Sequence, residues 1–143
     1  SGSASLNADF FPVIDNMVEV LKQYQGNISV EGHTDNIPIK TARFRSNWDL
    51  STARALEVAH ALFESGDVGQ ERFAVTGAAD TTPLVPNDTP EGRARNRRVE
   101  IVVEQPLDPE LAAELERIRD SASPALDVRK QLQIRGLSDD EIF

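Results

Sequence analysis

Two residues of opposite charge stand out, because the sequence places both where a folded chain would hold a side chain rigidly. Asp35 lies in a polar, loop-like cluster directly after an expected strand, and Arg54 lies about two turns into an expected helix. A fixed carboxylate beside a fixed guanidinium suits a ligand that carries both an ammonium and a carboxylate. Arg54 can bind a carboxylate through two parallel hydrogen bonds, which a lysine cannot reproduce. A purely structural ion pair between the two residues is the alternative, and it is the commoner role of such pairs.

Catalysis and metal binding have little support in the residue types. His33 and Asp35 have a spacing that suits a metal, but only His60 is available as a second imidazole, and it lies on the far part of a helix. The chain has no cysteine and no Gly-x-Ser-x-Gly turn. We therefore expect no enzyme, no catalytic residue, no metal and no cofactor, and we interpret His33 as a strand-end residue whose ring has hydrogen-bond partners.

The elements that position Asp35 and Arg54 can be predicted from the apolar periodicity. Apolar residues spaced by three and four predict a helix over residues 10–25, and the alternation of Ile28 and Val30 with polar residues predicts a strand over residues 27–32. Ser46 and Asp49 have the spacing of a capping box, which predicts the start of a second helix that ends near Gly66. Its expected core face consists of Leu50, Ala53, Leu56, Ala59, Leu62 and Phe63.

The second half of the chain predicts two more strands and a tail. Residues 72–77 and 98–104 are typical of strands, and Thr89 followed by Pro90 indicates a short helix between them. This order favours an α+β domain over residues 1–106, of a βαβαβ type, with helices packed on a small mixed sheet in two layers. Residues 107–143 carry nine acidic and five basic side chains, and we expect them to form an acidic, largely helical C-terminal extension.

Composition excludes several classes of protein. The net charge of -9 argues against nucleic-acid binding, because phosphate affinity requires dense lysine and arginine. A local exception is the cluster of Arg93, Arg95, Arg97 and Arg98, which we expect to be a solvated helix face from which Arg97 or Arg98 turns inward to an acidic residue. The sequence contains no apolar run of the roughly 18 residues that a membrane span requires. Because it opens on Ser-Gly-Ser without an initiator methionine, we expect an upstream segment in the natural protein.

Three motifs in order resemble the OmpA-like family of peptidoglycan-binding domains. They are the Gly-His-Thr-Asp turn at residues 32–35, the helix signature formed by Asn47, Leu50, Ser51, Arg54 and Ala55, and the Gly-Arg-Ala-x-Asn-Arg-Arg-Val-Glu ending at residues 92–100. The resemblance covers roughly residues 28–104, and three strings in the family's order and spacing are far more specific than any one of them. One departure is Gly77-Ala78-Ala79, where relatives usually have an aromatic residue and a second glycine.

The resemblance implies a ligand and a role for each site residue. The ligand is peptidoglycan, whose stem peptide often ends in meso-diaminopimelate with a free ammonium and carboxylate. By resemblance, Asp35 takes the ammonium and Arg54 the carboxylate. Thr34 and Asn47 would add hydrogen bonds, although Asn47 has a simpler alternative role as a helix cap. Asn96 and Arg97 would line the opposite rim.

The loops around residues 35–39, 46–48 and 86–92 look like those of flagellar motor stator B subunits, the MotB/PomB group. This implies a periplasmic domain of a bacterial inner-membrane protein, joined to a stator A subunit through an upstream membrane segment and usually paired as a homodimer. Two alternatives stay open. The module could anchor an outer-membrane protein or lipoprotein, or it could bind a protein partner through its tail while the cleft is idle.

Overall fold

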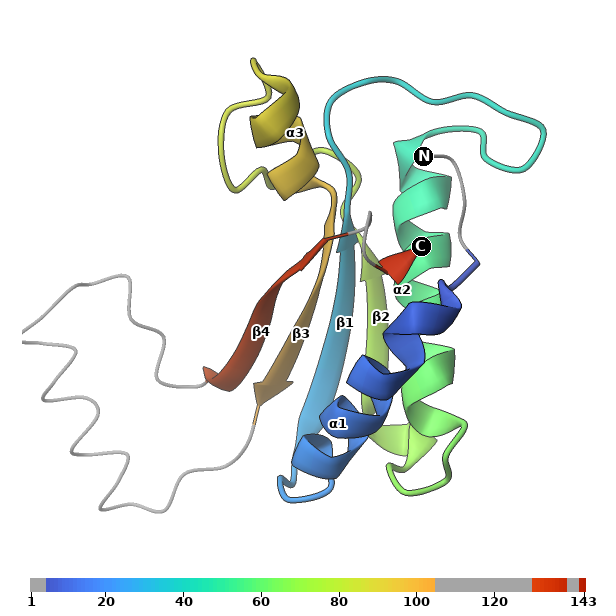
Figure 1. The fold of residues 1–143 in the computed structure, drawn as a ribbon, viewed down its shortest axis with the longest axis vertical. Coiled ribbons are helices and arrows are strands. Elements are labelled where there is room, and N and C mark those ends of the chain that lie inside the picture. The colour runs from blue at the N-terminus through green and yellow to red at the C-terminus, as the bar shows by residue number, and fades with distance from the viewer. Residues whose placement is uncertain (1–4, 105–129, 139–141) are drawn as a thin grey trace, which may run out of the picture.

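The structure is a computed structural model that describes residues 5–104, 130–138 and 142–143. Within these residues, four strands form one mixed sheet in the order β2-β1-β3-β4 (Figure 1). The strands are β1 (Asn27–His33), β2 (Phe73–Gly77), β3 (Arg98–Glu104) and β4 (Lys130–Ser138). β1 is parallel to β2 and antiparallel to β3, which in turn is antiparallel to β4. The expected α+β class with a mixed sheet is therefore confirmed.

Two helices pack on one face of this sheet. They are α1 (Phe11–Leu21), preceded by the 3-10 turn η1 (Ala8–Phe10), and α2 (Asn47–Phe63). The short helix α3 (Pro90–Asn96) stands at the end of the sheet where β1 finishes and β3 begins, and the 3-10 turn η2 (Gln70–Arg72) leads into β2 (Figure 1). This arrangement leaves the sheet end beside α3 as the place where loops gather.

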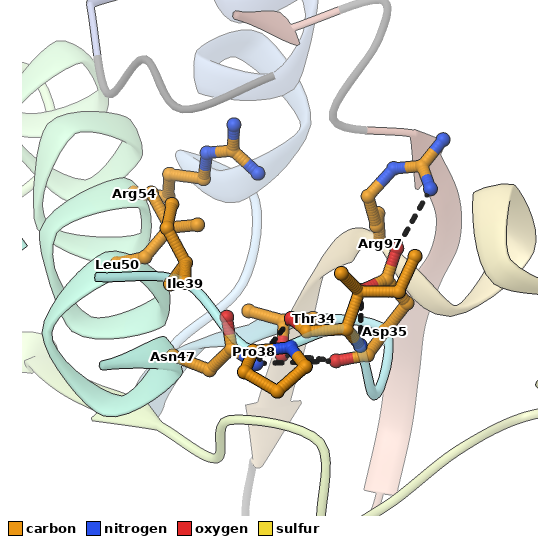
Figure 2. A pocket seen from close by; sticks show the side chains of 9 residues that line it. Thr34, Asp35, Pro38, Ile39, Asn47, Leu50, Arg54 and Arg97 are labelled. Carbon is orange, nitrogen blue, oxygen red and sulfur yellow. Dashed lines mark hydrogen bonds and ion pairs between the residues drawn. The ribbon is translucent and has the colours of Figure 1, made fainter. Parts of the chain in front are cut away.

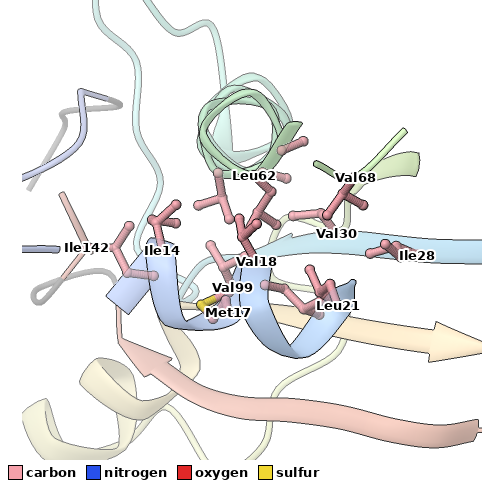
Figure 3. Packing of buried hydrophobic residues seen from close by; sticks show 14 of the residues in the cluster. Ile14, Met17, Val18, Leu21, Ile28, Val30, Leu62, Val68, Val99 and Ile142 are labelled. Carbon is pink, nitrogen blue, oxygen red and sulfur yellow. The ribbon is translucent and has the colours of Figure 1, made fainter. Parts of the chain in front are cut away.

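The hydrophobic core lies between the helices and the sheet (Figure 3). Ile28 and Val30 of β1 face it together with their partners Val103 and Ile101 of β3. The helices contribute residues at three- and four-residue spacing, among them Ile14, Val18, Leu21, Val58 and Leu62. Burying a side chain of this size contributes about 1.5–3 kcal/mol, so this layer holds β1 and α2 in fixed relative positions.

Glycines allow α2 to touch the ends of two strands. A Cβ on Gly32 would lie 2.1 Å from the backbone oxygen of Ser51, and a Cβ on Gly77 would lie 2.0 Å from Thr52 Oγ1. Gly32 and Gly77 are partners across β1 and β2. Only residues without a side chain permit this approach, so the start of α2 is held directly on the strand ends.

Both predicted helix starts are confirmed, with one change in detail. Ser46 Oγ accepts a hydrogen bond from Trp48 N, and Thr89 Oγ1 accepts one from Gly92 N. Asp49, expected to complete the capping box at the amide of Ser46, instead accepts from Arg45 N at 2.9 Å and pairs with the Arg45 side chain. This ion pair lowers the pKa of Asp49.

Three expectations about the elements need correction. The first helix ends at Leu21 rather than residue 25, because a turn precedes Gly26, whose φ is 114°. Leu56 is 43% exposed and not in the core; the buried residues of α2 are Leu50, Ser51, Arg54, Ala55, Val58, Ala59 and Leu62. The expectation of a largely helical extension is wrong over Lys130–Ser138, which is strand β4.

The segment after residue 106 therefore adds a strand to the domain's own sheet. β4 pairs with β3 from Arg98 opposite Ser138 to Glu104 opposite Lys130. The last described residues also join the domain, since Ile142 is fully buried in the core and its carbonyl accepts from Asn7 N at 2.7 Å. The rest of the expected helical extension lies outside the described residues, and the division at residue 106 stays a prediction.

Candidate functional site

Strand pairing brings distant residues together at one end of the sheet. Because β1 and β3 are antiparallel, His33 at the end of β1 lies opposite Arg98 at the start of β3. Asp35 lies two residues past His33 and Arg97 directly precedes Arg98, and Arg97 Nη1 donates to Asp35 Oδ2 at 2.9 Å across 62 residues of sequence. The first turns of α2 reach the same end through the Gly32 contact. Three separate segments therefore meet here.

The loop after β1 is held by its own side chains. Asp35 Oδ1 accepts from Ile37 N at 3.0 Å, and Thr34 Oγ1 donates to the carbonyl of Asp35 at 2.8 Å. Asn47, in the first turn of α2, donates from Nδ2 to the carbonyls of Ile37 and Asp35 at 3.1 and 3.4 Å. The capping residue is therefore Ser46 and not Asn47. Asn47 instead connects α2 to the loop through these hydrogen bonds.

A cavity of about 320 Å³ opens between this loop and α2. Figure 2 shows Arg54 on one side of it, and Asp35 with Arg97 on the other. Thr34 and Asn47 also line the cavity, so five of the six residues predicted for the site share one pocket. The remaining lining is apolar and was not predicted; it consists of Ile37, Pro38, Ile39 and Leu50.

The apolar side of the pocket has a small core of its own. Phe44 and Leu50 are buried together, with Ile39 and Ala53 packed against them. This cluster anchors the long loop between β1 and α2 on the helix. The sequence feature that could have predicted this apolar lining is Ile37-Pro38-Ile39, because apolar residues in a polar loop are stabilised by packing against another apolar surface.

Arg54 is almost fully buried, with 2% of its surface exposed. Its guanidinium carbon lies 5.0 Å from the centre of the Phe143 ring, a cation–π distance. Phe143 follows the core residue Ile142, so the end of the described chain packs on a residue of the pocket. Sequence reasoning missed Phe143, because no local motif links it to Arg54.

Asn96 is the one predicted site residue that the structure does not bring to the pocket lining. It is fully buried, and its side chain makes four hydrogen bonds. Its oxygen accepts from the backbone amides of Leu84 and Val85, and its amide nitrogen donates to Val85 O and Asn87 Oδ1. Asn96 therefore stabilises the loop before α3 through hydrogen bonds.

The loop after β2 completes this end of the domain. Ala79 N donates to Ser51 Oγ at 3.1 Å, and its carbonyl accepts from Thr34 N at 2.8 Å. Ala79 is buried and has a φ of 51°, a left-handed conformation that favours glycine. The departure from the family pattern at this position is therefore accommodated in a strained backbone.

His33 lies on the sheet face opposite the helices. It is 4% exposed, and within the described part of the chain neither ring nitrogen has a hydrogen-bond partner, so the expectation of a partnered ring is wrong. Its Nε2 is 3.7 Å from Glu100 Oε2, which also accepts from Arg98 Nε. Burial and the nearby Arg98 lower the pKa of His33, and Glu100 opposes them.

The described residues contain neither a candidate metal cluster nor a candidate membrane span. No group of three or more His, Cys, Asp or Glu in these ranges is placed to hold a metal ion. No helix among the described segments has both the length and the apolar character to cross a membrane.

Comparisons with known proteins agree with this geometry. Motility protein B of Bacillus subtilis is 36% identical over 104 residues, which cover 72% of this chain and 40% of that protein. The C-terminal domain of Helicobacter pylori MotB is 29% identical, with a TM-score of 0.67 over 84% of this chain and 90% of that one. The cell wall anchor of the T6SS from Pseudomonas aeruginosa is 49% identical, with a TM-score of 0.66 over 72% of this chain and 71% of that one.

The length of a family match identifies the family to which this chain belongs. Residues 1–97 match the OmpA family, which is more than half of the chain and includes β1, α2, β2 and α3 with the pocket between them. The chain spans about 40% of the length of the curated relative described above. On the sequence match and the shared fold, the chain belongs to the OmpA family.

Proposed function

We propose that the pocket binds the peptidoglycan stem peptide through the free end of meso-diaminopimelate. The observation that carries this proposal is the pair of opposite charges on facing sides of one pocket, Asp35 with Arg97 on one side and Arg54 on the other. The diaminopimelate ammonium would bind Asp35, and its carboxylate would bind Arg54 through the guanidinium.

The neighbouring polar residues have supporting roles in this proposal. Thr34 and Asn47 line the pocket while holding its loop, so they would contact the ligand and fix the Asp35 backbone. Asn96 would act indirectly, by holding the loop before α3. The function is binding without catalysis.

Sedimentation with purified peptidoglycan sacculi tests the proposal. We expect Asp35→Ala and Arg54→Ala to lose co-sedimentation, because each removes one of the two charges that the ligand needs. Asp88→Ala and Arg95→Ala are matched controls, since both residues are exposed and neither lines the pocket. Sacculi with amidated diaminopimelate should also bind less, because an amide cannot accept a bidentate Arg54. Equal sedimentation of the wild type and both pocket variants would refute the assignment.

We further propose that this binding anchors a flagellar motor stator to the cell wall. Two of the similar proteins are named Motility protein B or MotB, which supports this role. In this proposal the chain is the periplasmic part of an inner-membrane protein, it acts as a homodimer, and it joins a stator A subunit through an upstream membrane segment. Loss of swimming, with flagella still assembled, is the result expected on deletion of the gene.

A second candidate is the anchoring of a secretion machine. The T6SS cell wall anchor has 49% identity to this chain, higher than the identity to the motility proteins. The peptidoglycan chemistry is the same in both proposals, and only the attached machine differs. A deletion strain that swims normally but loses T6SS secretion would favour this candidate over the stator.

A further inference from the structure

The carboxylate proposed to receive the ligand ammonium is already paired. Arg97 Nη1 donates to Asp35 Oδ2 at 2.9 Å, and Ile37 N donates to Asp35 Oδ1 at 3.0 Å. The side chain of Asp35 is 11% exposed and that of Arg97 is 23% exposed. An incoming ammonium therefore meets a carboxylate with one oxygen held by the backbone and the other by a cation.

We propose that Arg97 is an internal competitor, whose place at Asp35 Oδ2 the ligand ammonium takes. This inference rests on the proposed function of the pocket. Two cations at one carboxylate oxygen repel each other, so the ammonium binds best when the guanidinium moves away. The bond from Ile37 is part of the loop and stays in place.

The two partners of this ion pair differ in how far they can move. The Asp35 backbone is tied by Thr34 and Asn47, so the carboxylate stays where it is. Arg97 is the residue at the C-terminal cap of α3, where its backbone N–H donates to Arg93 O, and its side chain is more exposed than that of Asp35. The arginine is therefore the partner that moves.

This exchange defines the ligand class. For a stem peptide with a free ammonium, Asp35 contributes to the binding free energy only the difference between its ion pair with the ammonium and its ion pair with Arg97. A stem peptide whose amine is acylated, as in a cross-link, has no charge to exchange and leaves the Asp35–Arg97 pair intact. The site therefore selects uncross-linked stem peptides, and Arg97 limits how tightly they bind.

Calorimetric titration of two probes tests the inference. The probes are the tripeptide L-Ala-γ-D-Glu-meso-diaminopimelate and the same tripeptide acetylated on its terminal diaminopimelate amine. In Arg97→Gln we expect the Kd of the free-amine probe to fall about twofold to fivefold, because an exposed ion pair contributes up to about 1 kcal/mol. The Kd of the acetylated probe should not change.

Two controls isolate the competition. Arg95→Gln removes the same charge from the same helix at an exposed position and should leave both Kd values unchanged. Arg97→Lys keeps a cation beside Asp35 and should stay close to the wild type. Urea midpoints confirm folding, and Arg97→Met serves as a second neutral variant if Arg97→Gln is unstable.

The outcomes separate this inference from the proposed function. Weaker binding of both probes to Arg97→Gln would make Arg97 a direct ligand contact and overturn the competitor role. Unchanged binding of the free-amine probe would overturn it as well. If the wild type does not bind the free-amine probe, or Asp35→Ala binds it equally well, the proposed function itself fails.

Discussion

Gly32→Ala tests whether the close contact between β1 and α2 determines both the stability of the domain and the geometry of the pocket. The added Cβ would lie 2.1 Å from Ser51 O, 2.9 Å from its carbonyl carbon and 3.3 Å from its Cα. All three are backbone atoms, so relief requires the helix to move away by roughly 1 Å. Overpacking of this kind costs about 1–3 kcal/mol.

Gly69→Ala is the matched control for this substitution. Its Cβ would also meet an atom at 2.2 Å, but that atom is Glu71 Oε1, at the end of a flexible side chain. Gly69 has a φ of -65°, which alanine adopts readily. We therefore expect Gly69→Ala to be neutral, or more stable by up to about 1 kcal/mol through the loss of unfolded-state entropy.

Urea unfolding and sacculus sedimentation measure the two consequences of Gly32→Ala. The free energy of unfolding should fall by up to about 2.5 kcal/mol after the same entropy gain is subtracted. Binding should also weaken, because Arg54 and Asn47 move with α2 while Asp35 stays in the loop after β1. If Gly32→Ala is as stable as Gly69→Ala and binds sacculi normally, α2 does not rest on β1 as described.

Four further outcomes are expected. Ala79→Gly should raise the unfolding free energy by up to about 1 kcal/mol in urea, because glycine relieves a left-handed φ. Asn96→Ala should lower it by about 2–4 kcal/mol, since buried loop amides lose their acceptor, whereas a residue that only contacts ligand would leave it unchanged. The lowered pKa of His33 means that the unfolded state binds the extra proton below pH ~6.5. Stability is therefore full above that pH and falls as the pH drops toward the folded pKa, and His33→Gln should flatten the change measured between pH 7.5 and 5. Phe143→Leu should weaken stem-peptide binding about threefold to tenfold by removing the ring beside Arg54, and Phe143→Trp should restore it.

Local patterns predicted most of the fold. Alternation identified β1, and the caps Ser46 and Thr89 identified the starts of α2 and α3, because these signals depend on neighbours in sequence. Leu56 was misplaced because the buried stripe of α2 includes the polar residues Ser51 and Arg54, which a hydrophobic pattern cannot reveal. β4 was read as helical, although Leu132 and Ile134 alternate with polar residues.

The candidate site was predictable only in part. Asp35 and Arg54 were found because each lies in a local motif of the family. The ion pair between Asp35 and Arg97 depends on the β1–β3 register, and the ring of Phe143 reaches Arg54 from the other end of the chain. Neither contact has a signature in nearby residues. Asn96 lies next to Arg97 in sequence, but its side chain bonds to the loop before α3 and does not line the pocket. The direction of a side chain cannot be predicted from its position in a motif.

The position of β1 determines how the domain would carry a mechanical load. β1 connects α1 directly to the loop that holds Asp35, and it has paired neighbours on both sides. Backbone hydrogen bonds run across the strands of a sheet. A pull between α1 and a polymer held at Asp35 would act along β1, so it would load the bonds to β2 and β3 in shear, all at once, and would not open them one after another. In the proposed role as an anchor that resists torque, the domain gains from having its ligand at the end of a central strand.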